Sequence, residues 1–344
     1  MKLSVVIPAY NRATLLPLTL RSLLAQERVA DEILVVDDGS SDGTAEIAEA
    51  FGDPVRVIRQ SNQGPGAARN RGLTEAQGEF IHFFDSDDLA LPNLHRDQLH
   101  TLQQTNADVA YSPWVKARLN PQQGVIPTNH VFQARGLPRG SLAHALLTNW
   151  STVPMAWLVR RTCAEAVGGF PADLRCGEDQ LFFLSMLLAG AHVVHSPFTL
   201  VLYRDEDRDK LSNPKNTGAQ QRQCLDWTQT LVRARNLGLS HGHDPAAWFG
   251  FRRRAYLALA ELQRWSETPQ SLINSLQDIA NASMSRGVSY RLSRALQQKG
   301  EGLTARLIGR RAHRSFRSSP LPAKVQSLCS EHLSSLLVDQ PIRH

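Results

Sequence analysis

The chain has 344 residues, of which 42% are hydrophobic and 20% charged, and its formal net charge is +6. This length exceeds that of a usual single domain, so a catalytic domain with an extension is expected. The four cysteines show neither metal-ligand spacing nor the density of a disulfide-rich secreted protein, which favours a reducing cytoplasm. No apolar run approaches the ~20 residues that span a bilayer, and the first residues read as a strand rather than a signal peptide.

The N-terminal part alternates between strand and helix patterns. An apolar, β-branched run over 3–8 predicts a buried strand, and leucines at helical spacing follow over 12–26. The next predicted elements are a strand at 32–36, a helix capped by Ser41 or Asp42 and ending near Phe51, a strand at 55–59, a helix at 67–77 and a strand at 79–84. This order predicts an α/β fold with a mostly parallel sheet and flanking helices.

Polar side chains follow each of these strands, and parallel strands bring their carboxyl ends to one crevice. They are Tyr10, Asn11 and Arg12 after the first strand, Asp37 and Asp38 after the second, Asn62 and Arg69 after the third, and Asp85, Asp87 and Asp88 after the fourth. A ring can stack on a base, a carboxylate can accept from an imide, a guanidinium can bind phosphate and acids can bind a metal. The set predicts a nucleoside-diphosphate site.

The acidic segment 85–88 has two interpretations. Mg²⁺ or Mn²⁺ is bound by one or two carboxylates, with a diphosphate completing its shell. Alternatively, the segment is a solvated acidic turn that caps the helix beginning near Pro92. The Asp-x-Asp spacing of Asp85 and Asp87 is a weak signal when taken alone.

The sequence Gly-Pro-Gly-Ala-Ala-Arg at 64–69 imitates a dinucleotide-binding fingerprint. Arg69 stands where the third glycine is needed for close helix packing, and the segment follows the third strand rather than the first. A Rossmann dehydrogenase is therefore rejected.

Six short blocks together resemble one known family. They are Val-Val-Ile-Pro-Ala-Tyr-Asn at 5–11, Leu-Val-Val-Asp-Asp-Gly-Ser-Ser-Asp-Gly-Thr at 34–44, Asn-Gln-Gly-Pro-Gly-Ala-Ala-Arg-Asn-Arg-Gly at 62–72, Gly-Glu-Phe-Ile at 78–81, Phe-Asp-Ser-Asp-Asp at 84–88 and Gly-Glu-Asp at 177–179. In this order they resemble the blocks of inverting family 2 glycosyltransferases of the GT-A fold, in the nucleotide-diphospho-sugar transferase superfamily. The resemblance covers about residues 1–212 and is specific jointly, although each block is weak singly.

The resemblance implies a role for each matching residue. It implies that Tyr10 stacks on a uracil-type base, Asp38 accepts from the imide, Asp37 lies near the ribose, Arg69 contacts the diphosphate, Asp85 contacts the ribose or sugar, Asp87 binds the metal and Asp179 is the catalytic base. Pro8, Ala9, Asn11, Arg12, Asn62 and Ser86 complete the expected nucleotide-sugar site, with Asp88, Glu178 and Glu206 as additional candidates. Many relatives have a histidine where this chain has Glu206, so the third metal contact differs in charge and reach.

Asp179 has a second interpretation. Transfer to a hydroxyl needs a group that takes its proton, which fits a catalytic base. Glu178 and Asp179 also open an apolar helical run, where an acid interacts with the helix dipole by a few tenths of a kcal/mol. Spacing alone favours the dipole role, and the family resemblance favours the base.

The segment 150–203 is expected to shape the acceptor side. Trp150 and Trp157 could stack on a sugar ring, although packing in the core is favoured for Trp157. His192 and His195 flank an apolar strand and are interpreted as structural.

The character of the sequence changes after Ser212. Residues 1–212 have 19 basic against 24 acidic side chains, a balance of −5, whereas residues 213–344 have 19 against 8, a balance of +11. We therefore expect a GT-A domain at 1–212 and a basic, mainly helical extension at 213–344, with helices at 220–237, 246–264 and 271–285 and a weaker basic segment at 291–317.

Dense basic spots occur at 252–254 and 310–314 within this extension. Contact with anionic lipid at the inner face of the membrane and a simple solvated face are both expected alternatives. No nucleic acid is expected, because no recognised binding motif accompanies the basic runs.

These patterns predict a metal-dependent inverting glycosyltransferase. It would move a sugar from a nucleotide-diphosphate donor, UDP-linked, to an acceptor hydroxyl in cell-surface or lipid-linked glycan synthesis. The alternatives are a nucleotidyltransferase and a nucleotide-sugar-binding protein without turnover. The acceptor and the donor sugar cannot be read from the sequence.

Overall fold

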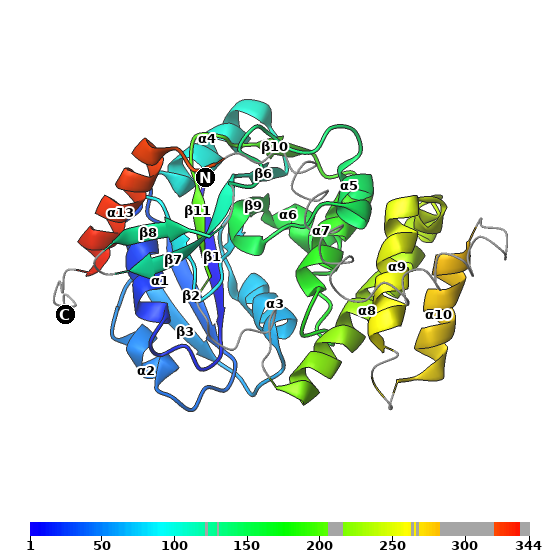
Figure 1. The fold of residues 1–344 in the computed structure, drawn as a ribbon. Coiled ribbons are helices and arrows are strands. Elements are labelled where there is room, and N and C mark those ends of the chain that lie inside the picture. The colour runs from blue at the N-terminus through cyan, green and yellow to red at the C-terminus, as the bar shows by residue number, and fades with distance from the viewer. Residues whose placement is uncertain are drawn as a thin grey trace.

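The computed structural model describes residues 1–120, 123–128, 131–205, 216–262, 265, 268–282 and 320–337. Its main sheet has seven strands in the order β10-β6-β9-β4-β1-β2-β3 (Figure 1). The strands are β1 (Leu3–Ala9), β2 (Glu32–Asp37), β3 (Val55–Arg59), β4 (Phe80–Phe83), β6 (Val109–Tyr111), β9 (Trp157–Arg160) and β10 (Val193–His195). The first four are parallel, and β9 runs antiparallel to both β4 and β6. The sheet is therefore mixed and mostly parallel, as predicted.

Helices cover this sheet because its strands are apolar on both faces. They are α1 (Leu16–Leu24), α2 (Thr44–Glu49), α3 (Pro65–Glu75), α4 (Leu94–Thr105), α6 (Arg161–Ala166) and α7 (Glu178–Leu188). Helix α3 packs closely on β1, where a Cβ at Gly72 would lie 2.2 Å from Cγ1 of Val6. A glycine at this position thus lets the helix bring Arg69 to the carboxyl edge of the sheet.

A smaller sheet of four strands lies beside the first, in the order β5-β11-β7-β8. Its strands are β5 (Leu89–Ala90), β7 (Trp114–Asn120), β8 (Gly124–Pro127) and β11 (Val201–Arg204). Helix α13 (Ala323–Leu337) packs against β8 and α1, and buries Cys329 and Leu333 in a second apolar cluster. The last described helix of the predicted extension therefore lies on the N-terminal half of the chain (Figure 1).

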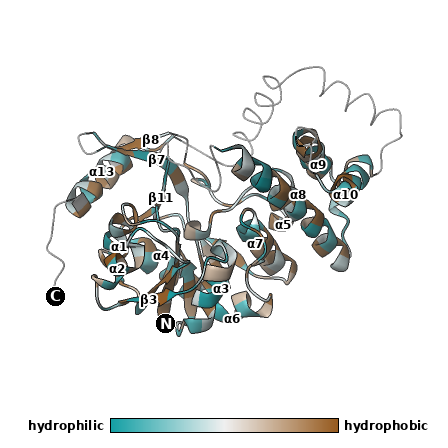
Figure 2. Cartoon of the chain, turned by 90° about the horizontal axis from the view of Figure 1, so that it is seen from below, coloured by the Kyte–Doolittle hydropathy of each residue, from teal (hydrophilic) through white to brown (hydrophobic). Residues whose placement is uncertain are grey.

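Four further helices stand together on the opposite side. They are α5 (Leu142–Thr148), α8 (Thr217–Ser240), α9 (Phe249–Leu262) and α10 (Gln270–Asn281), with short 3-10 turns at Pro154–Ala156 and Pro245–Ala247. Helix α8 packs on α7, and α9 packs on α5, α8 and α10, with apolar surfaces facing one another (Figure 2). The expected helices at 220–237, 246–264 and 271–285 correspond to α8, α9 and α10, while the predicted basic segment at 291–317 lies outside the described residues.

Three details differ from the sequence-based expectations. The N-cap of α2 is Gly43, at a φ of 80°, and Asp42 instead accepts a hydrogen bond from the Thr44 backbone N–H at 3.1 Å. Trp150 is fully buried, so its indole cannot stack on a sugar, whereas the full burial of Trp157 confirms the core packing favoured for it. His195 is the last residue of β10 rather than a flank of it.

None of the described helices is long and apolar enough to cross a membrane.

Candidate active site

The loops after β1 and β2 are tied together at the carboxyl edge of the main sheet. The Asn11 backbone N–H donates to Oγ of Ser40 at 2.9 Å, and Oδ1 of Asn11 accepts from the Ser41 backbone N–H at 3.0 Å. Asn11 has a φ of 52°, a left-handed conformation that asparagine tolerates better than most residues. This turn leaves the Tyr10 side chain 47% exposed, free to contact a ligand.

Asp37 and Asp38 are adjacent and both buried, but their surroundings differ. Asp38 accepts three hydrogen bonds, from Nε2 of Gln60 at 2.8 Å and from the backbone N–H groups of Gln63 at 2.9 Å and Gly64 at 2.8 Å. It therefore fixes the loop that leads into α3. Oδ1 of Asp37 has no hydrogen-bond partner, which is costly for a buried carboxylate unless a ligand supplies a donor.

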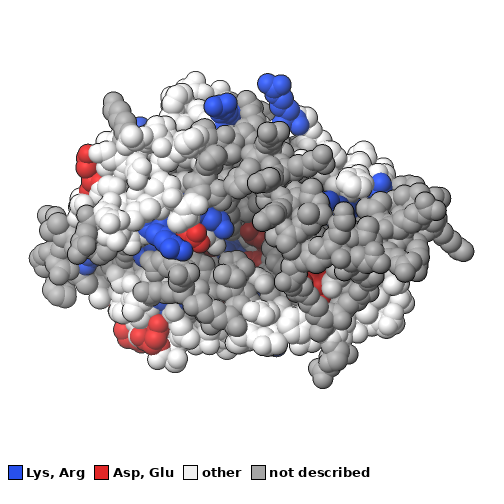
Figure 3. Space-filling model, in the orientation of Figure 1, with Lys and Arg blue, Asp and Glu red and all other residues white. Residues whose placement is uncertain are grey.

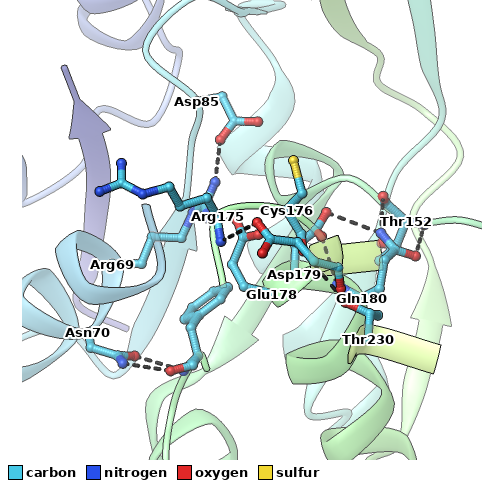
Figure 4. A network of polar contacts seen from close by, with 12 residues as sticks. Arg69, Asn70, Asp85, Thr152, Arg175, Cys176, Glu178, Asp179, Gln180 and Thr230 are labelled. Carbon is cyan, nitrogen blue, oxygen red and sulfur yellow. Dashed lines mark hydrogen bonds and ion pairs between the residues drawn. The ribbon is translucent and has the colours of Figure 1, made fainter. Parts of the chain in front are cut away.

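Arg69 joins the end of β4 to the start of α7. Its guanidinium is buried and forms ion pairs with Asp85 at 2.8 Å and with Glu178 at 2.7 Å, as Figure 4 shows. The Phe170 ring lies beneath it, with its centroid 5.3 Å from Cζ. Both terminal nitrogens thus hold protein carboxylates, and the implied contact with a diphosphate stays a prediction.

The Glu178–Asp179 pair opens α7 after Gly177, whose φ is 82°. Burial raises the pKa of Asp179, while the nearby Arg69 charge and hydrogen bonds from Gln180 act in the opposite direction. Burial also raises the pKa of Glu178. The Arg69 charge lowers this pKa, and the Asp179 carboxylate raises it further. Raised pKa values next to a specific charge partner are typical of functional carboxylates.

Gln180 holds the Asp179 carboxylate in place. Its Nε2 donates to Oδ2 of Asp179 at 3.1 Å and to the Thr152 carbonyl at 2.8 Å, and its Oε1 accepts from the Thr152 backbone N–H at 3.2 Å (Figure 4). The Gln180 backbone N–H also donates to Oδ1 of Asp179 at 2.8 Å. Sequence reasoning missed this residue, because its partner Thr152 lies 28 positions away.

The loop before α7 is anchored by helix α8. The Arg175 backbone N–H donates to Asp226 at 3.1 Å, and the Arg175 side chain donates to Oδ1 of Asn62 at 3.0 Å. A Cβ at Gly177 would lie 2.5 Å from Oγ1 of Thr230 on the same helix. The predicted extension thus touches the loop that carries the proposed base, a link that no local sequence pattern could indicate.

The four residues after β4 are held in different ways. Asp88 is buried and accepts from the Arg204 backbone N–H at 2.8 Å, and the Arg204 guanidinium contacts the Asp87 carbonyl. The buried Ser86 accepts at its carbonyl from Oγ1 of Thr19 at 3.1 Å. Asp88 thereby has a structural role, whereas the Asp87 side chain is half-buried.

The side-chain atoms after β4 that could bind a metal ion are carboxylate oxygens, which suit Mg²⁺ or Mn²⁺. Within the described part of the chain, no group of three or more His, Cys, Asp or Glu is arranged to hold a metal ion. Mg²⁺ is often bound by only one or two carboxylates plus substrate phosphates, so Asp87 with a diphosphate still fits that chemistry. Glu206 lies outside the described residues.

Charged groups of both signs meet on one face of the molecule. Figure 3 shows acidic and basic side chains together around a hollow near the middle of the face seen in Figure 1.

The family model described as glycosyl transferase family 2 matches residues 4–168. Residues 4–168 form a family 2 glycosyltransferase domain. Three uncharacterised glycosyltransferases, from Escherichia coli and two Rickettsia species, are 29–33% identical, but the matched regions span only 30–39% of their length. The succinoglycan biosynthesis protein ExoO of Rhizobium meliloti is 27% identical over 93% of this chain and 92% of its own.

Solved structures support the GT-A fold of the chain. Staphylococcus aureus TarS 1–349 in complex with UDP-GlcNAc superposes with a TM-score of 0.57 at 19% identity, covering 88% of this chain and 93% of that one. The mannosyltransferase PcManGT of Pyrobaculum calidifontis, in complex with GDP-Man and Mn²⁺, gives 0.53 at 15% identity, covering 97% and 86%. At these identities the likeness establishes the fold alone.

Proposed function

We propose that the chain is a metal-dependent glycosyltransferase that moves a sugar from a UDP-linked donor to an acceptor hydroxyl with inversion. The observation that carries this proposal is the Arg69 bridge, which links Asp85 on the donor side to Glu178 beside Asp179. A proton acceptor next to a nucleotide-binding edge is what transfer to a hydroxyl requires. The relatives extend this to the synthesis of cell-surface or lipid-linked glycans, because ExoO is named for succinoglycan biosynthesis.

On the donor side, the exposed Tyr10 ring would stack on the base, and the unpartnered Asp37 oxygen would accept from the base or ribose. Asp38 keeps the adjoining loop in shape and would leave one acceptor site, on Oδ2, for the imide. Asp87 would hold a divalent cation together with the diphosphate. When bound, that cation would neutralise the charge that develops on the departing diphosphate.

On the acceptor side, Asp179 would take the proton of the attacking hydroxyl. Its raised pKa makes it a better proton acceptor than an ordinary carboxylate, provided that it is ionised at the working pH. The attack of that oxygen on the face opposite the diphosphate would produce inversion at the anomeric carbon.

Binding of the donor distinguishes this function from its alternatives. Asp87→Ala should weaken UDP binding in the presence of Mn²⁺ and abolish transfer, while leaving metal-free UDP binding unchanged, because only the metal bridge is removed. Calorimetry with UDP, with and without Mn²⁺, measures this. Equal loss in both conditions would remove Asp87 from the metal site, and turnover of a nucleoside triphosphate without sugar transfer would favour a nucleotidyltransferase.

Fewer basic residues of the extension are available for contact with a membrane than its net charge suggests. Arg252 and Arg254 donate to backbone carbonyls of Ala246, Ala247, Leu146 and Trp150, so both guanidinium groups are held against the protein rather than extended toward a membrane surface. Arg310, Arg311 and Arg314 lie outside the described residues. Peripheral contact with anionic lipid stays a proposal that rests on those three arginines. A cytoplasmic location also stays a proposal, and it rests on the pattern of the four cysteines.

A further inference from the structure

A cavity of about 590 Å³ lies between α5, α7, α8 and α9, beside the proposed base. Its walls are mainly apolar, with Leu146 from α5, Leu184 from α7, Leu231 from α8 and Phe251 from α9. The volume falls in the range of small-molecule sites, which are usually apolar with a few placed polar groups.

Gln180 connects the cavity to Asp179, the proposed base. This side chain lines the cavity and donates to Asp179, as described above. Ser151 also lines the cavity and lies between Trp150 and Thr152, whose backbone groups bond to Arg254 and Gln180. A molecule in the cavity would therefore have one end close to Asp179.

Arg254 supplies a half-buried positive charge to the wall of this cavity, which Glu261 also lines. Its guanidinium donates to the carbonyls of Leu146 and Trp150, both at 2.9 Å, which uses two of its five N–H groups. Among the described residues no carboxylate forms an ion pair with it, and burial lowers its pKa to about 10. A half-buried guanidinium with no carboxylate paired to it and with N–H groups left over favours an anionic ligand group.

We propose that this cavity binds the hydrocarbon chain of a lipid phosphate, with the Arg254 guanidinium facing the phosphate, so that the acceptor is a lipid-linked molecule. The chain would displace water from the leucine-lined walls, and the phosphate would complete the hydrogen bonding of Arg254. The role of this lipid as acceptor rests on the proposed glycosyl transfer. The binding of the hydrocarbon chain and the phosphate in the cavity is independent of that proposal.

Calorimetry with farnesyl phosphate, farnesol and inorganic phosphate tests this site on the full chain. Wild type should bind farnesyl phosphate saturably and inorganic phosphate much more weakly. Arg254→Gln should weaken farnesyl phosphate binding about tenfold or more, and farnesol binding by less than about twofold, because only the charge contact is lost. Arg253→Gln removes the same charge from the adjacent position, which does not line the cavity, and should change neither.

A second variant keeps the test independent of Arg254. Ala258→Phe places a ring in the cavity and should weaken farnesyl phosphate and farnesol alike. The proposal is wrong if wild type fails to bind farnesyl phosphate, if the variants at 253 and 254 behave alike, or if Ala258→Phe binds normally. Phosphatidylglycerol vesicles that displace farnesyl phosphate would contradict a single-chain acceptor. UDP calorimetry on the same preparations reports separately on the donor site, so a failure of the glycosyltransferase assignment is distinguishable.

Discussion

Asp179 owes its properties to its neighbours as much as to its position. Burial raises its pKa, whereas Arg69 and Gln180 stabilise the ionised form that a base requires. The same arginine holds Glu178, so the two acids at the start of α7 share one cation. We infer that Glu178 positions Arg69, while Asp179, which accepts hydrogen bonds from the backbone and side chain of Gln180, is available to an acceptor.

Gln180→Met should move the acid limb of the pH–rate profile to higher pH by about one unit, because a hydrogen bond to the charged carboxylate is lost. The sign follows from the bond, which lowers the pKa of Asp179; without it the base is protonated at a pH where wild type is still active. Steady-state rates across a pH series measure the shift. A uniform fall in rate with an unmoved acid limb would make Gln180 merely structural.

Many of the site residues could be named from sequence because each follows a strand of a parallel sheet. Tyr10, Asn11, Asp37, Asp38 and Asp85 all lie at the carboxyl ends of β1, β2 and β4. Gln180, Arg175 and Asp226 could not be found in this way, since their roles arise from contacts between segments 28 to 113 residues apart. No local spacing signals such contacts.

At the scale of elements, α8 supports the loop that precedes α7. Asp226 is buried and accepts from the backbone of Arg175, whereas Asp173 forms an exposed ion pair with Arg233 on the same helix. The two acids join the same loop to the same helix in different environments. Only the first interaction is shielded from water.

Asp226→Ala should therefore lower the free energy of unfolding by about 1–3 kcal/mol and reduce turnover, because a partly buried N–H loses its acceptor. Asp173→Ala is the matched control and should cost less than about 1 kcal/mol with unchanged turnover. Urea denaturation and steady-state rates on both variants measure this. Equal effects of the two substitutions would show that α8 does not support the catalytic loop.

The element boundaries at the start of the chain were predicted within a few residues, since alternating strands and helices carry clear periodicity. The small sheet was harder to predict, because β5 has only two residues and pairs with β11, more than a hundred positions later. Helix α13 was not predicted either, because its apolar residues are interrupted by serines and its partner strand β8 is distant in sequence.

At the scale of the whole molecule, the region after residue 212 does not stand apart from the residues before it. Helix α13 packs against strand β8 of the small sheet. Helices α8 and α9 contribute walls of the cavity beside Asp179. The boundary at 212 marks a change in composition, and we infer that both regions contribute to one folded unit.

Leu333→Ala should lower the free energy of unfolding by about 2–5 kcal/mol, because Leu333 is 2% exposed against β8 and its neighbours. Leu328, on the same helix, is 52% exposed, and Leu328→Ala should change stability by no more than about 0.5 kcal/mol. Chemical denaturation of both variants provides the comparison. If the two were equally stable, the docking of α13 would contribute nothing to the fold.

The role of Asp179 is tested most directly by Asp179→Asn, which keeps the shape of the side chain and removes the proton acceptor. We expect UDP-sugar binding, measured by calorimetry, to stay within about twofold of wild type, while transfer at saturating acceptor falls by at least ~10²-fold. Near-native transfer by this variant would contradict the assignment of Asp179 as the base and direct attention to Glu178.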